Sequence, residues 1–350
     1  MIESRDMSIV FQGNMPLKGS AEYQLFFENL AEIRLVFPDS PILLGTWNDC
    51  EVPRELEISH VEFLKDPGQL PSFKKNTPYI DNNVNRQIIC SSQILEKVLT
   101  RYTLKLRLDC ELQYTGFLEY YSKYGKTTDG HERIVVPSFF TIDPRMYEQM
   151  PFHISDWVAF GLTKKIQQMW KASFMSKDDA TYYDQNYYAA HSTYFDKLYR
   201  SRFAIEQYIA VQYASKLGYV TPVYHNDISG EILINHDKFI AREFLILDLS
   251  QFGIICRKYI KASKSSFQYL NCLKFLDWYL LNVVNDPGFK VDITTYQAAL
   301  RRKQIKKIAS SVMFVTNPLM PLIKKPFIKP VVSAILRAFL ISEQFKNNYL

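Results

Sequence analysis

The chain has 350 residues, of which 47% are hydrophobic and 22% are charged. This composition is that of a folded globular protein and excludes a disordered chain, and the length allows one large domain or two modest ones. The formal charge of +6 is a small surplus of 42 basic over 36 acidic residues, so charge alone does not indicate nucleic-acid binding. The five cysteines are widely spaced and contain no Cys-x-x-Cys pair, which argues against a disulfide-stapled or zinc-caged fold.

The N-terminus and the hydropathy of the chain predict a location inside the cell. The first residues, MIESRDMSIVFQG, mix acidic and basic side chains where a signal peptide would need an apolar run. No stretch reaches the roughly 18 consecutive apolar residues that a membrane-spanning helix needs. We therefore expect a cytoplasmic protein, or one bound to the inner face of the cytoplasmic membrane.

The first fifty residues predict a strand, a helix and a second strand. Apolar runs at Met7 to Phe11 and Pro41 to Trp47 have the length of buried strands. Between them, Glu22 to Phe37 has the spacing of a helix that packs on one face. A strand, helix and strand in this order form a βαβ unit, which belongs to a parallel sheet.

Polar and aromatic side chains stand where these two strands should end. Gln12, Gly13 and Asn14 follow the first run, and Trp47 ends the second. Ligands of parallel sheets bind beyond the carboxyl ends of the strands, so we expect this set to bind a nucleotide. The alternative is ordinary turn chemistry, for which glycine and asparagine are common residues.

The next segment combines a long loop with a polar helix start. Residues 66–83 hold three prolines and a glycine, which predict a loop, and long loops in compact domains are often functional. A helix is expected from about residue 83, and its first turn carries Asn85 and Arg86. A cation at a helix start opposes the helix dipole, so Arg86 indicates an anionic partner.

Residues 102–111, YTLKLRLDCE, alternate as in a strand with one apolar and one polar face. The polar face carries Lys105, Arg107, Asp109 and Glu111. A divalent ion held by one or two carboxylates neutralises a departing nucleoside diphosphate, so Asp109 and Glu111 are candidate ligands for manganese or magnesium. The alternative is that Lys105 and Arg107 form salt bridges with the same carboxylates.

Seven short motifs resemble the WavE lipopolysaccharide-synthesis family. They are, in order, SIVFQG, LLGTWND, KDPG, NNVNRQI, LKLRLD, SDWVAFG and EQYI, and they cover about the first 215 residues. The resemblance implies a glycosyltransferase similar to GT-A enzymes, in which a carboxylate motif after a central strand binds the metal and the donor diphosphate. On this chain that role falls to Asp109 and Glu111. The motif is Asp-Cys-Glu rather than Asp-x-Asp, and a metal-free transferase would use Lys105, Arg107 and Arg86 instead.

A transferase that inverts the sugar needs a carboxylate to take the proton of the acceptor hydroxyl. Asp156 lies among apolar and aromatic residues in HISDWVAFG, and its alternative role is to cap a helix expected from Trp157 to Trp170. Glu206 lies on an expected helix in FAIEQYIAVQY, where the alternative is an exposed glutamate. The resemblance implies an acceptor-site role for Glu206.

The second half of the chain has a different pattern. The tyrosine-rich segment from Lys171 to Arg200 is expected to be an irregular packed insert or an acceptor-binding lid. After Gly218, TPVYH, EILIN and FLILDL predict short strands, and an apolar helix is expected from Tyr269 to Val284. From Ala299 onward, basic and bulky apolar residues are interleaved, as in segments that contact an anionic membrane. The alternative is a helix pair that closes the core.

We therefore predict an α/β fold with a GT-A-like mixed, largely parallel sheet flanked by helices and a mostly helical C-terminal extension. Residues 1–218 would form the nucleotide-sugar-binding and catalytic domain, and residues 219–350 a region of short strands and basic amphipathic helices. The predicted activity is sugar transfer from a nucleotide-sugar donor to a lipopolysaccharide or capsular glycan, with a lipid-linked glycan among the acceptors. The alternatives are a non-catalytic membrane-associated scaffold of polysaccharide assembly and a sugar nucleotidyltransferase. No nucleic-acid partner is expected, because no recognition module is present.

Overall fold

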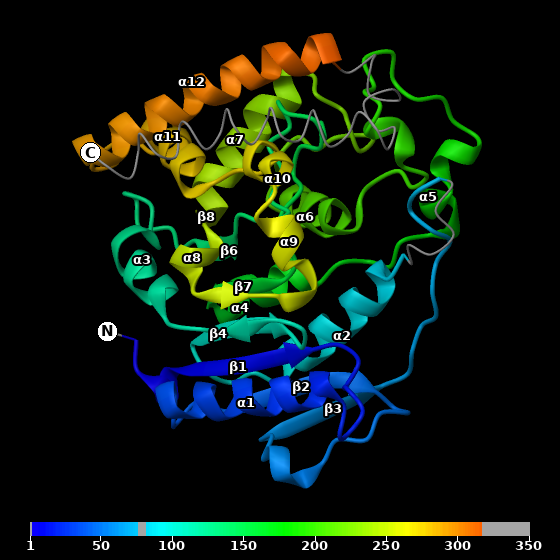
Figure 1. Ribbon diagram of the computed structural model, residues 1–350, viewed down its shortest axis with the longest axis vertical. Coiled ribbons are helices and arrows are strands. Elements are labelled where there is room, and N and C mark those ends of the chain that lie inside the picture. Colours follow the sequence, from blue (N-terminus) through cyan, green and yellow to red (C-terminus); the bar gives the residue numbers. More distant parts are fainter. Residues whose placement is uncertain (1, 76–81, 317–350) are drawn as a thin grey trace.

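The computed structural model describes residues 2–75 and 82–316, which build a seven-stranded sheet flanked by helices (Figure 1). The strand order across this sheet is β3-β2-β1-β4-β7-β6-β8. Its strands are β1 (Met7–Gln12), β2 (Ile42–Trp47), β3 (His60–Leu64), β4 (Tyr102–Arg107), β6 (Ile134–Pro137), β7 (Val158–Leu162) and β8 (Phe244–Leu247). Two further short strands, β5 (Glu111–Leu112) and β9 (Ile254–Ile255), pair antiparallel outside it.

The described residues also form twelve α-helices. In the N-terminal half they are α1 (Ala21–Val36), α2 (Val84–Glu96), α3 (Gly116–Tyr124), α4 (Thr163–Trp170) and α5 (Lys177–Ala180). The later helices are α6 (Ile205–Lys216), α7 (Gly230–Glu243), α8 (Leu249–Phe252), α9 (Ile260–Ser263), α10 (Ser266–Asn271), α11 (Phe275–Asn285) and α12 (Ile293–Thr316). Helix α12 lies at the opposite end of the molecule from α1 (Figure 1).

The sheet is mixed and largely parallel, which confirms the predicted fold class. Strands β3, β2, β1 and β4 run parallel to one another, and β6 runs parallel to β8. All six residues of β1 are buried, as expected for a central strand that is covered on both faces. The predicted first strand, first helix and second strand are confirmed.

Strand β7 is the exception, since it runs antiparallel to both β4 and β6. The sequence predicts a helix from Trp157 to Trp170, and the first part of that prediction is wrong. Residues Val158–Leu162 form β7, and helix α4 begins only at Thr163. Short apolar runs fit a buried strand as well as a helix, and here the ladder with β4 decides between them.

The strand predicted to run to Glu111 ends at Arg107. The chain then turns, and the backbone N–H of Cys110 donates to the carbonyl of Arg107 at 3.0 Å. Asp109 therefore lies in a turn beyond the sheet, while Glu111 begins the separate strand β5. Strict alternation continues through the turn in the sequence, so the pattern alone does not mark the end of the strand.

Beyond Gly218 the predicted strands are mostly wrong. EILIN lies within α7, where Ile232, His236 and Ile240 recur every four residues and are buried on one face, and TPVYH forms no strand. Only Phe244–Leu247 of FLILDL is a strand, β8, and it completes the large sheet from beyond residue 218. The division of the chain into two domains at that point stays a prediction.

The single apolar helix predicted from Tyr269 to Val284 is divided into α10 and α11. Cys272, between them, forms an isolated β-bridge with Ile142. The tyrosine-rich segment 171–200 has only one short helix, α5, and two single 3-10 turns, so it is largely irregular, as expected.

Helix α12 uses two of its basic residues inside the protein. The Lys306 ammonium lies 2.6 Å from a carboxylate oxygen of Asp143 and 3.1 Å from one of Asp277, and Arg302 also contacts Asp277. Both basic side chains are buried. The later basic stretch, residues 322–341, lies outside the described residues. Among the described helices, none combines the length and the hydropathy needed to cross a bilayer.

Arg133, which directly precedes β6, forms a buried ion pair that should contribute strongly to stability. Its side chain is fully buried, donates to the backbone carbonyls of Ala241, Tyr124 and Lys126, and lies 2.9 Å from the buried Asp286 carboxylate. Arg133→Met should lower the free energy of unfolding by about 3 to 5 kcal/mol, because it leaves that carboxylate buried without its cation. Urea unfolding followed by tryptophan fluorescence measures this.

The matched control is Arg242→Met, which removes the exposed partner of Asp129 on the same side of the protein. It should cost less than about 1 kcal/mol, because exposed ion pairs contribute little. Equal losses in the two variants would contradict the assignment of Arg133.

Candidate functional site

The carboxyl ends of β1, β2 and β4 lie together and frame a cavity of about 310 Å³. Gln12 is in register with Gly45 of β2 on one side and with Arg107 of β4 on the other. Residues that follow these strands therefore converge at one edge of the sheet. The cavity is lined by Gln12, Gly13, Asn14, Trp47, Asn83, Arg86, Gln87, Arg107, Leu108 and Asp109.

Seven of the nine predicted donor-binding residues line this cavity, which we call the strand-end cavity: Gln12, Gly13, Asn14, Trp47, Arg86, Arg107 and Asp109. Gly13 has a φ of 137°, a backbone conformation that favours glycine, and this turns the chain at the end of β1. The sequence prediction therefore located a real cavity, and its binding role stays a prediction.

Asn85 and Lys105 lie elsewhere. The Asn85 side chain exchanges two hydrogen bonds with the backbone of Met175, of 2.7 and 3.1 Å, and so ties α2 to the segment before α5. Lys105 is fully buried, donates to the carbonyl of Asp156 at 2.7 Å, and lies 3.9 Å from the centre of the Trp170 ring. Burial lowers the pKa of Lys105 to about 8.

Arg86 has an anionic partner within the protein. Its guanidinium binds both carboxylate oxygens of Asp66 and also donates to the Asn83 side chain at 3.1 Å. The sequence predicts an anionic partner for Arg86. Asp66, from the preceding loop, is such a partner within the protein. Arg86 still lines the strand-end cavity, where an anionic ligand could share it.

Arg107 lies between two carboxylates. It donates to the two oxygens of Asp109 at 2.9 and 2.6 Å, and one of its terminal nitrogens is 4.0 Å from Asp156. Burial lowers the pKa of Arg107, but the negative charges of Asp156 and Asp109 outweigh burial and raise it. The predicted salt bridge to Asp109 is therefore present, and it leaves Asp109 exposed enough to line the cavity.

Asp156 reaches Arg107 because β7 is reversed. Val158 at the start of β7 pairs with Leu106 near the end of β4, so the residues just before β7 lie at the same sheet edge. The Asp156 side chain is only 2% exposed, and neither carboxylate oxygen has a hydrogen-bond partner among the described residues. An unsatisfied buried carboxylate beside a cation is typical of a functional position rather than of a helix cap.

A second cavity, of about 740 Å³, adjoins the first and shares Asn83, Gln87 and Arg107 with it. We call it the aromatic cavity. Its rings come from distant segments: Phe73, Phe140, Trp157, Phe195, Tyr199, Tyr259 and Phe267. Its polar and charged side chains include Lys74, Glu148, His153, Glu206, Lys258 and Gln268.

Glu206 opens into this aromatic cavity from the first turn of α6, so the expected helix is confirmed and the side chain is 20% exposed. Burial, together with the charge of Asp156, raises the pKa of Glu206 to about 8. His153 lies 3.6 Å away and donates from Nδ1 to the Phe140 carbonyl at 2.8 Å. Burial lowers the pKa of His153 to about 4, so a neutral imidazole faces a protonated carboxyl at neutral pH.

A third cavity, of about 570 Å³, lies on the other side of Asp109. Asp109, Glu111, Arg257 and Lys258 line it. Glu111 is held by Arg257 through two contacts of 2.6 and 2.8 Å. Carboxylate oxygens suit manganese or magnesium, so Asp109 fits a cation at the strand-end cavity, whereas Glu111 would first have to leave Arg257.

Sequence reasoning missed several residues of the aromatic cavity. His153 and Trp157 flank Asp156 in a motif that was already singled out, so a signal for them existed. Lys74 lies in the long loop that was singled out as a whole, whereas Lys258 and Tyr259 lie in a 3-10 turn with no distinctive sequence pattern, and only the fold brings them to this cavity.

The fold and site define an α/β protein with two adjoining cavities, one of them at the carboxyl ends of its parallel strands. The chain belongs to the WavE lipopolysaccharide synthesis family, whose family model matches residues 7–310. The resemblance found over the first 215 residues is thus confirmed and extends further. No curated protein matches the chain.

Two of the solved structures that match the chain illustrate a distant likeness. The first is a galactosyltransferase, LgtC, in complex with donor and acceptor sugar analogs, at 13% identity and a TM-score of 0.27, covering 46% of this chain and 60% of that chain. The second is an active-site mutant of LgtC, at 11% identity and a TM-score of 0.28, covering 57% of this chain and 85% of that chain. The chain spans 60% of the length of the first structure it matches. The assignment rests on the family match alone.

Glu206 should make stability depend on pH. Its folded pKa of about 8 lies above the ordinary value of 4.5, so the carboxyl stays protonated in the fold while the unfolded chain ionises. The stability contributed by this group is complete below pH 4.5 and is lost as pH rises through 8. Glu206→Gln should therefore have a higher melting temperature than wild type at pH 8, and the difference should vanish near pH 4.5.

Thermal unfolding at a series of pH values measures this difference. Glu119→Gln, which changes an exposed glutamate on α3, is the control for replacing a carboxyl group by an amide. A melting-temperature difference between Glu206→Gln and wild type that does not change with pH would contradict the raised pKa of Glu206.

Proposed function

We propose that this protein is a glycosyltransferase that moves a sugar from a nucleotide-sugar donor to a lipopolysaccharide or capsular glycan. The observation that carries the proposal is that two cavities of different chemistry meet at Arg107. The smaller is lined by two arginines and several amide side chains, and the larger by seven aromatic rings together with charged side chains. Transfer requires two bound reactants in contact, and two adjoining cavities support that requirement.

The strand-end cavity is the proposed donor site. Gln12 and Asn14 offer hydrogen bonds, and Trp47 offers a ring face to the nucleotide. Arg86 and Arg107 provide two guanidinium groups for the diphosphate, since planar guanidinium groups bind phosphate oxygens in pairs. Their present partners, Asp66 and Asp109, would then share them with the ligand.

A divalent ion, manganese or magnesium, is the proposed cofactor, and Asp109 is the residue that would hold it. Such an ion supplies Lewis-acid stabilisation of the charge that develops on the departing diphosphate. Asp109 lines both the strand-end cavity and the neighbouring cavity of Glu111, so it is open to an ion from either side. Arg107 stabilises the same developing charge from the protein side.

Glu206 is the proposed general base, and Asp156 is the proposed positioning residue. Glu206 opens into the aromatic cavity, where an acceptor hydroxyl would lie, and a pKa near 8 makes it a strong proton acceptor once it is ionised. Asp156 does not line that cavity, and its carboxylate faces Arg107. It would orient the guanidinium toward the diphosphate rather than touch the acceptor.

The aromatic cavity is the proposed acceptor site. Tyr259 packs against Trp157 with ring centres 4.9 Å apart, and such rings stack on the apolar faces of sugars. An acceptor attached to a lipid would be presented at a membrane. Helix α12 exposes Ile293, Leu300 and Ile308 beside basic side chains, a surface that suits an anionic bilayer and a peripheral location inside the cell.

A nucleotide-binding screen tests the donor site. Nucleoside diphosphates with manganese should raise the melting temperature of wild type, and one base should do so selectively. Asp109→Asn should weaken this binding by about tenfold or more, because it removes the proposed metal ligand. The control Asp39→Asn changes an exposed aspartate far from the cavities and should behave as wild type.

If nucleoside diphosphates raise the melting temperature without metal, and still do so in Asp109→Asn, the arginines alone would bind the diphosphate. No stabilisation by any nucleotide would contradict the proposal and favour a non-catalytic scaffold. Stabilisation by nucleoside triphosphates together with a sugar phosphate would favour a nucleotidyltransferase.

A ring deletion tests the acceptor site. Tyr259→Ala should raise the KM for the glycan acceptor by about tenfold, since a stacked ring is worth roughly 1 to 2 kcal/mol, and leave nucleotide binding unchanged. Sugar transfer to isolated lipopolysaccharide core measures the KM. Tyr187→Ala, at a fully exposed ring, is the control. A loss of nucleotide binding with an unchanged acceptor KM would assign the aromatic cavity to the donor instead.

A further inference from the structure

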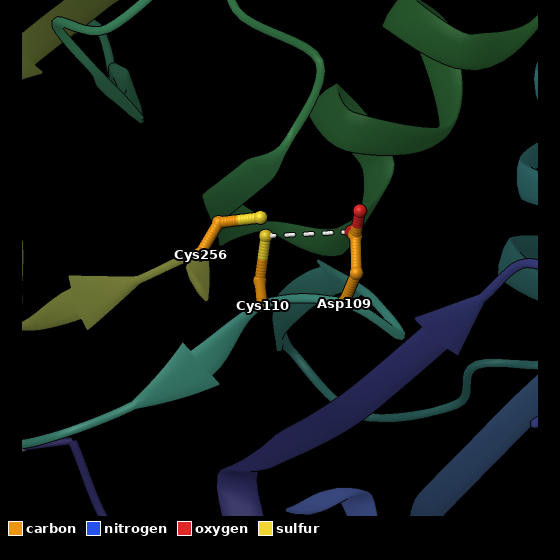
Figure 2. A group of neighbouring side chains, drawn as sticks. All are labelled: Asp109, Cys110 and Cys256. Atoms are coloured by element: carbon orange, nitrogen blue, oxygen red, sulfur yellow. Dashed lines mark hydrogen bonds between the residues drawn. The ribbon is translucent and has the colours of Figure 1, made fainter. Parts of the chain in front are cut away.

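Two cysteines that are 146 positions apart in the sequence lie side by side next to Asp109 (Figure 2). The sulfur atoms of Cys110 and Cys256 and a carboxylate oxygen of Asp109 all lie within 4.8 Å of one another. The Cys110 thiol donates to the nearer Asp109 oxygen at 3.9 Å. Both cysteines are buried, at 0% and 3% exposure, while Asp109 reaches the surface of two cavities.

The fold holds the two thiols together. Strands β5 and β9 pair antiparallel, with Glu111 opposite Ile255 and Leu112 opposite Ile254. The next position outward in this register places Cys110 opposite Cys256, and side chains directly opposite on paired strands are close neighbours. Their approach is therefore built into the strand pairing that follows the donor carboxylate.

We propose that Asp109, Cys110 and Cys256 form a binding site for a soft divalent cation, for which zinc is the physiological representative. Two sulfurs and one carboxylate oxygen are ligand types that zinc prefers, and a fourth, tetrahedral position would be left to water. Zinc displaces a proton from each thiol and forms two zinc–sulfur bonds, so binding releases two protons per ion. Two thiolates and one carboxylate carry three negative charges against the two positive charges of zinc. Arg107, which binds the Asp109 carboxylate, balances the remaining negative charge.

The ion would enter through the cavity beside Glu111. Asp109 lines that cavity, as do Arg257 and Lys258, which directly follow Cys256. The site has a consequence for catalysis that rests on the proposed function. Because Asp109 would serve both the hard cation of the donor site and the soft cation, the two ions could not be bound at once. Zinc would therefore inhibit donor binding.

Cobalt titration of the full-length, reduced and metal-free protein tests the site without any activity measurement. Wild type should bind one cobalt ion with thiolate-to-cobalt charge-transfer absorption in the near ultraviolet, and one equivalent of zinc should remove this absorption. Cys110→Ser and Cys256→Ser should each lose at least half of it, and Asp109→Asn should weaken binding about tenfold. Cys90→Ser is the matched control, since Cys90 is equally buried but bonds to the Gly45 carbonyl.

Absence of the absorption in reduced wild type, or its survival in both serine variants, would overturn the proposal. A mass lower by two hydrogens without reductant, combined with no cobalt binding after reduction, would also overturn it and indicate a disulfide pair. None of these outcomes depends on the glycosyltransferase assignment.

Competition between the two ions is tested separately. One equivalent of zinc should abolish manganese-dependent stabilisation by the nucleoside diphosphate in wild type and leave it intact in Cys256→Ser. Full stabilisation of zinc-loaded wild type would overturn the shared role of Asp109.

Discussion

The two cations near the carboxyl end of β4 are the constraint on which the site depends. Lys105 is fully buried, whereas Arg107, two positions further along the strand, is 19% exposed and lines two cavities. Removing a charge from water costs several kcal/mol, so the fold must provide each with a partner. Asp156 is a partner of both cations. Its backbone carbonyl accepts a hydrogen bond from Lys105, and its carboxylate lies near Arg107. Asp109 completes the second pair from the turn beyond the strand.

The reversed strand β7 supplies this arrangement. A strand parallel to β4 would bring its carboxyl end to the site, whereas the antiparallel β7 brings the residues that precede it. These are His153, Asp156 and Trp157, and they join the end of β4 to the aromatic cavity. Because β7 is antiparallel to β4, the Asp156 carboxylate and two residues of the aromatic cavity, His153 and Trp157, lie at the edge of the sheet where β4 ends.

The C-terminal half closes the site as well as completing the sheet. Strand β9 pairs with β5 directly after Asp109, and the residues that follow β9 reach two of the cavities. Arg257 holds Glu111, while Tyr259 packs on Trp157. A cut at residue 218 would remove these contacts and one strand of the sheet, so the proposed reaction centre draws on both predicted regions.

The sequence alone determined the first βαβ unit, which is β1, α1 and β2, and the strand-end cavity at its edge, whereas β3 and β6 were not predicted. Apolar runs and the helix between them are local patterns, and parallel strands bring their carboxyl ends together whatever the rest of the chain does, so seven of nine predicted donor residues were found in one cavity. The tertiary structure alone decided the direction of β7, the end of β4 at Arg107, and the meeting of Cys110 with Cys256. Each of these depends on pairing between segments far apart in the chain, and such pairing leaves no periodic signal in either segment.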